Sequence, residues 1–564
     1  PPPPTPPPPP PPPRRYDIVY GDVMLNFNYN INRFDIAATV GWTGRYENMN
    51  NIRVSTNGGL VTENWFDLNA SRYTPSSTLQ RMELLKTGYM GTLSLGWDNY
   101  LFLELTGRQE RSSTLKDQSF FYPSANLSFL FTQAFHMPSW WNYGKLRLSY
   151  GIVGNAPETY TANIVYEQGS DNGFTWNTIP SSWGNADIRP EKKYEYEIGL
   201  ESKFLNNRLG IDVSYYNNRV KDQILSTPQP STSGVKNVLM NVGEVANHGW
   251  DISISATPIL TRDFRWDLTA NYGVYKNKVV KLADGVPYLE ILNSGGSGIK
   301  IQAVEGQPMG DIYAQVPQVN ENGEYLVSDK GLYLNQTELQ KVGNINPAGV
   351  GGLFNSFSYK NVFLDFSIDF RIGGDVINEM NQYATAVGLT PESLKYRDTE
   401  HGGLSYYYPG DNNSSGIPVQ VDPSTGVGPN GEIIYHDGII LPGVVASTGE
   451  RNTRIIPAGY YYNTTYNWGT EAEQLTYRHS VFDNSYVKLR ELTIGYQFPE
   501  KMISKLGLGR LSVSVFGRNL FYFYKALKNY DAESSVGTSW ANQATVGSST
   551  TATRSFGVSL RASF

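Results

Sequence analysis

The chain of 564 residues contains no cysteine, which excludes a disulfide framework. It also lacks any run of about 18 apolar residues, which excludes membrane-spanning helices but not membrane-spanning strands. Charged residues make up only 17% of the chain, below the roughly 25% of typical soluble domains. The net charge of −6 provides no basic surface, which argues against nucleic-acid binding.

Alternation of apolar and non-apolar residues is the main pattern that the chain does contain. Unbroken nine-residue alternations occupy three segments, 264–272, 364–372 and 556–564. With 40% apolar residues, chance produces roughly one such stretch or fewer. Because successive side chains of a strand point to opposite faces, each segment predicts a strand with one apolar and one wet face. Aromatic residues make up 13%, and the 39 tyrosines suit a surface where lipid meets water.

Segment 364–372 shows which face we expect to meet lipid. One face carries only apolar side chains, whereas the other carries Asp365, Asp369 and Arg371. Three ionisable groups in hydrocarbon would cost several kcal/mol in total, so the apolar face must point outward. We therefore predict that Asp365, Asp369 and Arg371 line a wet lumen.

The chain reads as one all-β unit, a transmembrane antiparallel β-barrel over residues 14–564. Short turns, predicted at Asn32-Arg33 and Asp98-Asn99 among others, alternate with long connections, which is typical of outer-membrane barrels with long extracellular loops. We expect roughly 14 to 16 strands. The long loops are expected at about 43–88, 152–192, 276–350 and 376–480. Residues 1–13 are proline-rich and cannot form a barrel strand, so they are either an extended linker or an artefact.

Signals for chemistry are weak, and we predict no catalytic, metal or cofactor site. The five histidines are scattered, and residues 426–431 match GxGxxG only formally, inside a turn-rich loop. Acidic loops at 320–324 and 411–415 offer oxygen ligands for calcium, although solvated turns explain them better. Tryptophans in the long loops are candidates for contact with a ligand or partner, or for packing of the loops on each other: Trp65, Trp176, Trp183 and Trp468.

Several motifs together resemble the SusC-type (SusC/RagA-like) TonB-dependent transporters of the outer membrane. Their order and spacing cover nearly everything from about residue 14 onward. They are KLRLSYGIVGN (145–155), NADIRPE (185–191), VEGQPMG (304–310), VGNINP (342–347), NSYVKLRELTIGYQFP (484–499), FGRNL (516–520), YDAESS (530–535) and the terminal Phe564.

The resemblance implies a barrel of about 22 strands plugged by an N-terminal domain. A plug and a TonB box are not found in this sequence, so we expect the chain to be the C-terminal barrel portion of a longer or incomplete polypeptide. By resemblance, it imports an oligosaccharide or peptide, energised by TonB, with a SusD-like lipoprotein as lid, and Phe564 serves as assembly signal. No cofactor is implied. A passive porin, a surface adhesin or an outer-membrane enzyme remain the alternatives.

Overall fold

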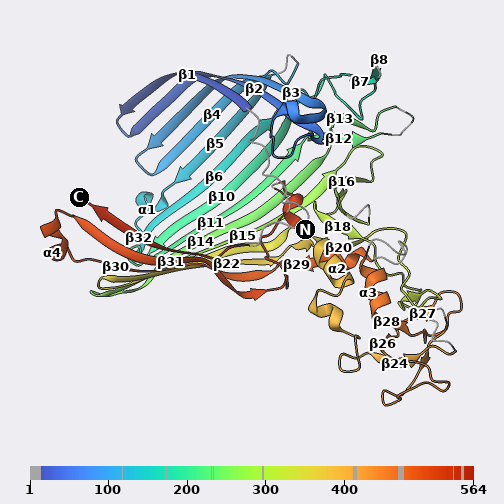
Figure 1. Ribbon diagram of the computed structural model, residues 1–564. Coiled ribbons are helices and arrows are strands. Elements are labelled where there is room, and N and C mark those ends of the chain that lie inside the picture. The colour runs from blue at the N-terminus through green and yellow to red at the C-terminus, as the bar shows by residue number, and fades with distance from the viewer. Residues whose placement is uncertain are drawn as a thin grey trace. The chain divides into compact units, whose positions relative to one another are not determined.

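The computed structural model describes residues 14–116, 119–171, 174–229, 232, 234–294, 298–410, 416–467, 476–535, 537, 539–547 and 552–564. Within these residues, fifteen strands form one large antiparallel sheet in the order β1-β2-β3-β4-β5-β6-β10-β11-β14-β15-β21-β22-β30-β31-β32 (Figure 1). This number confirms the expected 14 to 16 strands. The proline-rich segment 1–13 lies outside the described residues.

The strands of the large sheet are mostly longer than ten residues. They are β1 (Arg14–Ile31), β2 (Phe34–Leu60), β3 (Ser71–Trp97), β4 (Leu101–Ser112), β5 (Ser119–Phe129), β6 (Trp141–Asn155), β10 (Glu191–Phe204), β11 (Leu209–Lys221), β14 (Glu244–Leu260), β15 (Phe264–Lys281), β21 (Pro347–Tyr359), β22 (Val362–Gly373), β30 (Tyr486–Gln497), β31 (Arg510–Lys525) and β32 (Ser555–Ser563).

The other elements lie in the connections between these strands. The strands are β7 (Glu167–Asp171), β8 (Phe174–Thr178), β9 (Ser182–Trp183), β12 (Ile224–Pro228), β13 (Asn237–Asn241), β16 (Tyr288–Ser294), β17 (Ile299–Val304), β18 (Asp311–Ala314), β19 (Leu326–Val327), β20 (Gln340–Asn344), β23 (Asp375–Ile377), β24 (Leu404–Tyr407), β25 (Val419–Gln420), β26 (Tyr435–Ile439), β27 (Val444–Val445), β28 (Ile456–Pro457) and β29 (Val481–Asp483). The helices are α1 (Phe131–Ala134), α2 (Glu379–Ala386), α3 (Ala458–Tyr466) and α4 (Glu500–Ile503), with short 3-10 turns including η1 (Leu68–Ala70), η5 (Tyr477–Ser480) and η6 (Ser504–Leu506). In the part of the chain that the structure describes, no helix is long and apolar enough to cross a membrane.

Contacts divide the chain into two compact units. The first comprises Pro1–Ser202, Ser214–Asn247 and Lys281–Val286, and the second comprises Lys203–Val213, His248–Val280 and Pro287–Phe564.

In the first unit, tight turns join the strands where the sequence predicts them. Ile31 pairs with Phe34 across a turn in which Asn32 has a φ of 54°. Asp98 and Asn99 also have positive φ, a conformation that Asn and Asp tolerate better than most residues. Helix α1 lies at the same end as these turns, opposite β7, β8, β12 and β13 (Figure 1).

The expected long loop at 43–88 is wrong. Strand β2 continues to Leu60 and β3 begins at Ser71, so the connection is only 61–70. The polar sequence is held in a ladder, in which Asn48 pairs with Glu83 and Asn50 with Arg81. Backbone hydrogen bonds need no apolar side chains where both faces are wet, and for that reason hydrophobic alternation fails to detect these strand halves.

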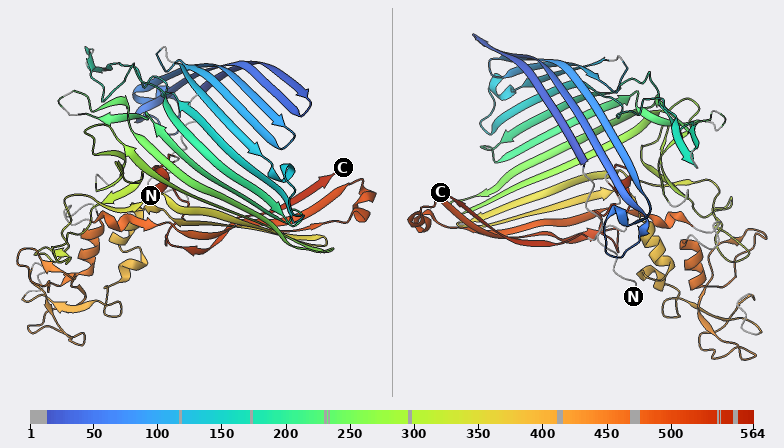
Figure 2. Two further views of the ribbon diagram at one scale, coloured as in Figure 1. Left: turned by 180° about the vertical axis from the view of Figure 1, so that it is seen from behind. Right: turned by 45° about the horizontal axis from the view of Figure 1, so that its top comes forward.

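The other long loops contain structure of their own, and their bounds shift. The connection expected at 152–192 runs from 156 to 190 and includes β7, β8 and β9. That expected at 276–350 runs from 282 to 346 and folds β16, β17, β18 and β20 into a four-stranded sheet. The connection between β22 and β30 (residues 374–485, here the lobe) carries α2, α3 and several short strands. It lies at the opposite end of β30 and β31 from α4 (Figures 1 and 2).

Most buried apolar side chains belong to these connections, not to the large sheet. In the second unit one cluster joins β17, β18 and the start of the lobe through Ile299, Ile301, Ile312 and Ile377. A second cluster combines Ile439, Leu441 and Ile456 of the lobe with Leu332, which lies between β19 and β20. The connections therefore have ordinary hydrophobic cores.

Candidate functional site

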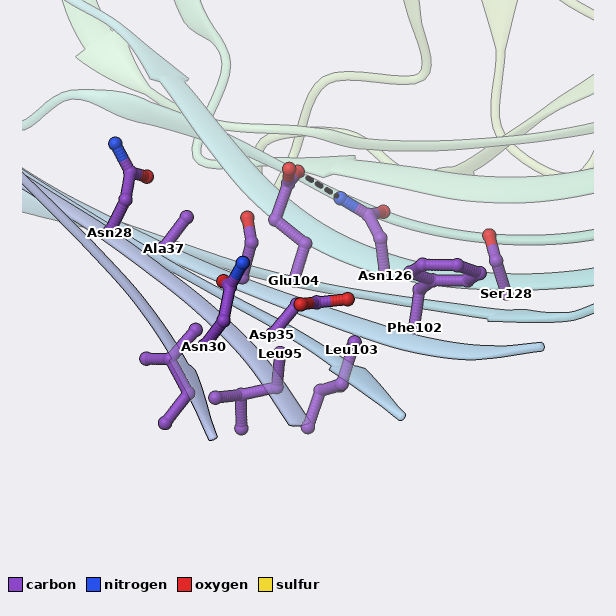
Figure 3. A pocket seen from close by; sticks show the side chains of 13 residues that line it. Asn28, Asn30, Asp35, Ala37, Leu95, Phe102, Leu103, Glu104, Asn126 and Ser128 are labelled. Atoms are coloured by element: carbon purple, nitrogen blue, oxygen red, sulfur yellow. Dashed lines mark hydrogen bonds between the residues drawn. The ribbon is translucent and has the colours of Figure 1, made fainter. Parts of the chain in front are cut away.

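One face of the sheet in the first unit is a polar surface of amides, hydroxyls and carboxylates. Close to the short turns, Asn28, Asp35, Glu104 and Asn126 project from this face, whereas Leu103 projects from the other (Figure 3). The side-chain amide of Asn126 donates to Oε1 of Glu104 at 3.3 Å. These residues line a hollow of about 650 Å³. Hydrogen-bonding groups of this kind suit a hydrated solute better than an apolar one.

The three predicted lumen residues lie on strand β22 of the second unit. Asp365 accepts a hydrogen bond from Ser356 at 2.6 Å and shares a hollow of about 270 Å³ with Glu491 and Arg561. Asp369 forms an ion pair with Arg490 at 2.5 Å. These placements agree with one polar face, while exposure of the two carboxylates to a lumen stays a prediction.

Arg371 does not stand free on this face. Its Nε donates to the carbonyl of Gly373 at 3.1 Å, and its Nη2 donates to the carbonyl of Ile345 at 3.1 Å. The guanidinium thus joins the end of β22 to the connection that precedes β21. Alternation placed Arg371 on the polar face but gave no information about these backbone partners.

The main charged cluster of this face centres on Glu533, in the connection between β31 and β32. Its carboxylate accepts a hydrogen bond from Nη2 of Arg490 at 2.6 Å. It also forms an ion pair with Nζ of Lys488 at 2.6 Å. Lys488 is 1% exposed, and its ammonium also lies 4.8 Å from the ring centroid of Tyr522. The cluster fastens this connection to strand β30.

Burial on its own would raise the pKa of the Glu533 carboxyl, because it disfavours the charged form. Hydrogen bonds from Arg490 and Lys488, with their charges, outweigh burial and hold this pKa at about 2. Glu533 is therefore an anion at any physiological pH. It balances the charge of the buried Lys488 ammonium.

The cluster explains two motifs of the sequence. NSYVKLRELTIGYQFP supplies Lys488 and Arg490, and YDAESS supplies Glu533. Asn484, from the first motif, also donates to the carbonyl of Ala532 in the second at 2.9 Å. Asn484 and Ala532 are 48 residues apart in the sequence, so the two motifs form one structural unit.

Other motifs also meet in pairs at the roots of the long connections. VGNINP joins VEGQPMG because the Asn346 side chain donates to the carbonyl of Met309 at 2.6 Å. In the first unit, KLRLSYGIVGN joins NADIRPE because the Asn155 side chain donates to Glu191 at 3.2 Å. Ile188 of NADIRPE is fully buried in a cluster with Leu115, Phe120 and Ala162. These motifs position connections on the sheet.

The candidate tryptophans occupy different settings in the first unit. Trp65 is 52% exposed in the connection between β2 and β3. Trp176 is 46% exposed on β8, with its ring over Gly169 of β7. Trp183 makes an edge-to-face contact with Tyr166 at 5.9 Å. The structure does not bring them into one site, and Trp468 lies outside the described residues. Phe564 follows β32 and is 98% exposed, and its role as assembly signal stays a prediction.

The segment that matches GxGxxG is a turn closed by a carboxylate. Glu432 is buried, and its oxygens accept the backbone N–H of Asn430 at 2.8 Å and that of Gly410 at 3.2 Å. The bond from the Asn430 N–H is the largest reason why the pKa of Glu432 falls to about 2. No strand-to-helix turn is present at these described residues.

The described residues contain no candidate metal-binding site. There, no group of three or more His, Asp or Glu side chains could hold a metal ion. Within loop 320–324, the Asn320 side-chain amide donates to the Glu324 carboxylate at 3.0 Å. Its Oδ1 accepts the backbone N–H of Asn322 at 3.0 Å, as in a solvated turn. Loop 411–415 lies outside the described residues.

Sequence reasoning missed most of the charged cluster. It named Asp369 but not Arg490, Lys488 or Glu533, because a β-bulge between Leu489 and Glu491 breaks the alternation of β30 there. It also missed Asp35 and Glu104, which lie in shorter alternating segments. The available signal was the presence of charged residues in NSYVKLRELTIGYQFP and YDAESS.

Known proteins resemble the chain in sequence and in fold. Residues 5–304, more than half of the chain, match the family model described as TonB dependent receptor-like, beta-barrel. The chain is 24% identical over 494 residues to TonB-dependent receptor P3 of Formosa agariphila, covering 80% of this chain and 42% of that protein. It is 30% identical over 247 residues to the TonB-dependent receptor SusC of Bacteroides thetaiotaomicron, covering 40% of this chain and 24% of that protein.

A solved structure of the RagAB peptide importer in its open-open state has a similar fold. The TM-score is 0.69 at 18% identity, and the match covers 98% of this chain and 56% of that chain. At this identity the likeness concerns the fold alone. The chain spans less than half the length of the curated relatives that it matches.

Proposed function

The chain belongs to the TonB-dependent receptor-like β-barrel family of the outer membrane, and on this premise we propose that it forms the wall of an active importer. The cargo is an oligomeric nutrient, an oligosaccharide or a peptide, that is too large for ordinary porins. The protein moves this cargo without changing it chemically. The predicted fold class and outer-membrane location are those of the family.

The contrast between the two faces of the sheet carries this proposal. On β30, β31 and β32, Ile494, Val515 and Val558 lie in register and are 54%, 57% and 72% exposed. The residues next to them in sequence turn to the opposite face, which carries hydroxyls and charges. A sheet of this kind is stable with lipid on one side and water on the other. The wet side then offers a path to a polar solute.

Energy comes from TonB, and a SusD-like surface lipoprotein acts as the partner that covers the entrance. Relatives named TonB-dependent receptor and SusC support this, as does a fold neighbour titled as the RagAB peptide importer. Amides and carboxylates at the hollow beside Asp35 and Glu104 suit either hydroxyl-rich or peptide cargo.

Uptake by cells that carry the full-length protein tests the proposal. A fluorescent oligosaccharide and a fluorescent peptide are supplied to cells with and without a functional TonB. We expect accumulation of one of them only where TonB is present. Equal uptake without TonB would identify a passive pore, and binding at the surface without accumulation would identify an adhesin.

A further inference from the structure

Pairs of aromatic residues recur at one spacing on three strands of the first unit. On each strand the two residues are eight positions apart, so they lie on the same face. The pairs are Phe34 and Trp42 on β2, Trp97 and Tyr89 on β3, and Phe129 and Phe121 on β5. Phe34 is directly opposite Trp97, with which it stacks at 6.4 Å, and Trp42 is directly opposite Tyr89.

This spacing fits the thickness of a membrane. Eight residues rise about 26 Å along a strand, or roughly 20 Å across the membrane at a tilt of 35–45°. The apolar band of outer-membrane barrels is about 25 Å tall and has aromatic residues at both edges. Trp42 and Tyr89 therefore mark the lipid boundary on the side away from the short turns.

Strands β2 and β3 continue far beyond this boundary. Past it, the face that was apolar carries Glu83 and Arg81, opposite Asn48 and Asn50. Lipid must end before these charges, because charged side chains on the lipid face are destabilising. From Asn50 to Leu60 the hairpin extends a further ten residues, roughly 25 Å at the same tilt. Its end therefore stands in water.

The tip of this hairpin, residues 61–73, nevertheless displays large apolar side chains. Those that are exposed are Val61 (60%), Trp65 (52%), Phe66 (59%), Leu68 (44%) and Tyr73 (62%). The tip is an ordered turn, since the N–H of Val61 donates to the carbonyl of Ala70 at 2.8 Å. Asp67 caps η1 by accepting the N–H of Asn69 at 2.8 Å. An ordered apolar patch that lipid cannot cover is typical of a protein contact.

We propose that this tip is a docking surface for an apolar groove on the surface lipoprotein partner, and this inference rests on the proposed function. Aliphatic Val61 and Leu68 beside the aromatic rings suit a protein groove better than the flat face of a sugar ring. Glu63 and Asp67 outnumber Arg72, so a groove bordered by basic side chains complements the tip.

The size of the patch sets its role within the contact. Five half-exposed side chains of this kind offer roughly 400–500 Å², against the ~800 Å² that each partner buries in a standard interface. The tip therefore supplies one part of a larger contact. Loss of the tip weakens the complex strongly, because aromatic residues at the centre of a patch dominate binding.

Co-purification of the tagged full-length protein from its native outer membrane tests the proposal. The variant Trp65→Ser with Phe66→Ser is compared with the matched control Phe135→Ser with Trp140→Ser, which removes the same residue types, 62% and 52% exposed, from the connection between β5 and β6. Lipoprotein is identified by mass spectrometry of its acylated N-terminus. We expect at least a tenfold lower recovery for the tip variant and recovery near wild type for the control.

Each other outcome overturns a defined part of the argument. Equal recovery with the tip variant and wild type overturns the docking surface alone. If the tip variant keeps the lipoprotein but loses uptake, the tip contacts cargo instead. If wild type recovers no lipoprotein, the partner in the proposed function fails, and the inference fails with it.

A labelling experiment checks the position of the tip independently. Because the 564 residues contain no cysteine, Phe66→Cys and Phe34→Cys add labelling positions outside and inside the expected lipid band. We expect a membrane-impermeant maleimide to label Phe66→Cys in intact cells, and brominated lipid to quench a probe only at Phe34→Cys. Quenching of the probe at Phe66→Cys would place the tip in lipid and overturn the proposal.

Discussion

Large apolar side chains are exposed on strand β32 but buried in the lobe between β22 and β30. Phe556, Val558 and Leu560 of β32 are 73%, 72% and 68% exposed, whereas Tyr406 and Ile456 of the lobe are 1% and 3% exposed. Among their described residues, both regions are rich in apolar side chains. The difference is the solvent, because lipid surrounds one region and water the other. Burial of apolar side chains away from water thus stabilises the lobe. Contact of apolar side chains with lipid hydrocarbon stabilises the strand in the membrane.

The largest effect is expected from Tyr406→Ala, which removes a ring from the lobe core. Tyr406 packs edge-to-face on Tyr408 and donates to Asp437 at 3.1 Å. Truncation of a buried aromatic costs about 3–5 kcal/mol. We expect rapid proteolysis within residues 404–439 while the strands stay inserted in the membrane. Tyr406→Phe is the control and should cost about 1 kcal/mol. Loss of membrane insertion with Tyr406→Ala would show that the two regions do not fold separately.

A charge on the lipid face tests the other half of the comparison. Val515→Arg places a cation among exposed apolar side chains of β31, and near the bilayer midplane this costs about 2–4 kcal/mol. Its neighbour Ser514→Arg points to the polar face and should cost far less. Heat-modifiable migration on gels reports the folded fraction of each variant in the membrane. Equal folded fractions would contradict the assignment of the two faces.

The sequence allowed the faces of the strands to be predicted, but not the ends of the strands. Alternation identified β15, β22 and β32, and turn residues such as Asn32 located the hairpins. It failed at 43–88, because strands that are wet on both faces carry no period of apolar residues. The structures of the hairpin tip and of the lobe could not be predicted from alternation either. Their apolar residues pack through tertiary contacts between distant segments.

The charged cluster shows the same limit at the candidate site. Asp369 was predicted from alternation, while its partner Arg490 sits at a bulge where alternation breaks. Glu533 lies in a connection with no period of its own, and only the folded chain brings it to Lys488. The spacing of residues within one strand can be read from the local sequence. Which connection packs on which strand depends on residues far apart in the chain, so it cannot be read in this way.

Glu533→Gln is expected to have an intermediate effect, confined to the junction between strand and connection. Lys488 would keep its buried position but lose its counter-charge, which costs about 1–3 kcal/mol for an unsatisfied buried group. Hydrogen exchange of residues 526–535 should accelerate, while that of β32 should not change. The control is Glu500→Gln on exposed α4, which should have no effect on either segment. Equal exchange in both variants would show that the ion pair does not hold the connection.

The smallest effect is expected from mild acid, and its sign follows from the pKa of Glu533. This pKa is about 2 in the folded protein, below the ~4.3 of an unperturbed glutamate. A lowered pKa stabilises the folded state fully above pH ~4.3, and this contribution is lost progressively as the pH falls from there through about 2. Between pH 7 and 5, exchange of residues 526–535, corrected for the intrinsic rate, should therefore stay constant. Below pH ~4.3 the corrected exchange should accelerate progressively as the pH falls towards 2. Exchange that stays constant down to pH ~2.5 would mean that the Glu533 carboxylate is not held by Arg490 and Lys488, and that the connection depends on apolar contacts as the lobe does.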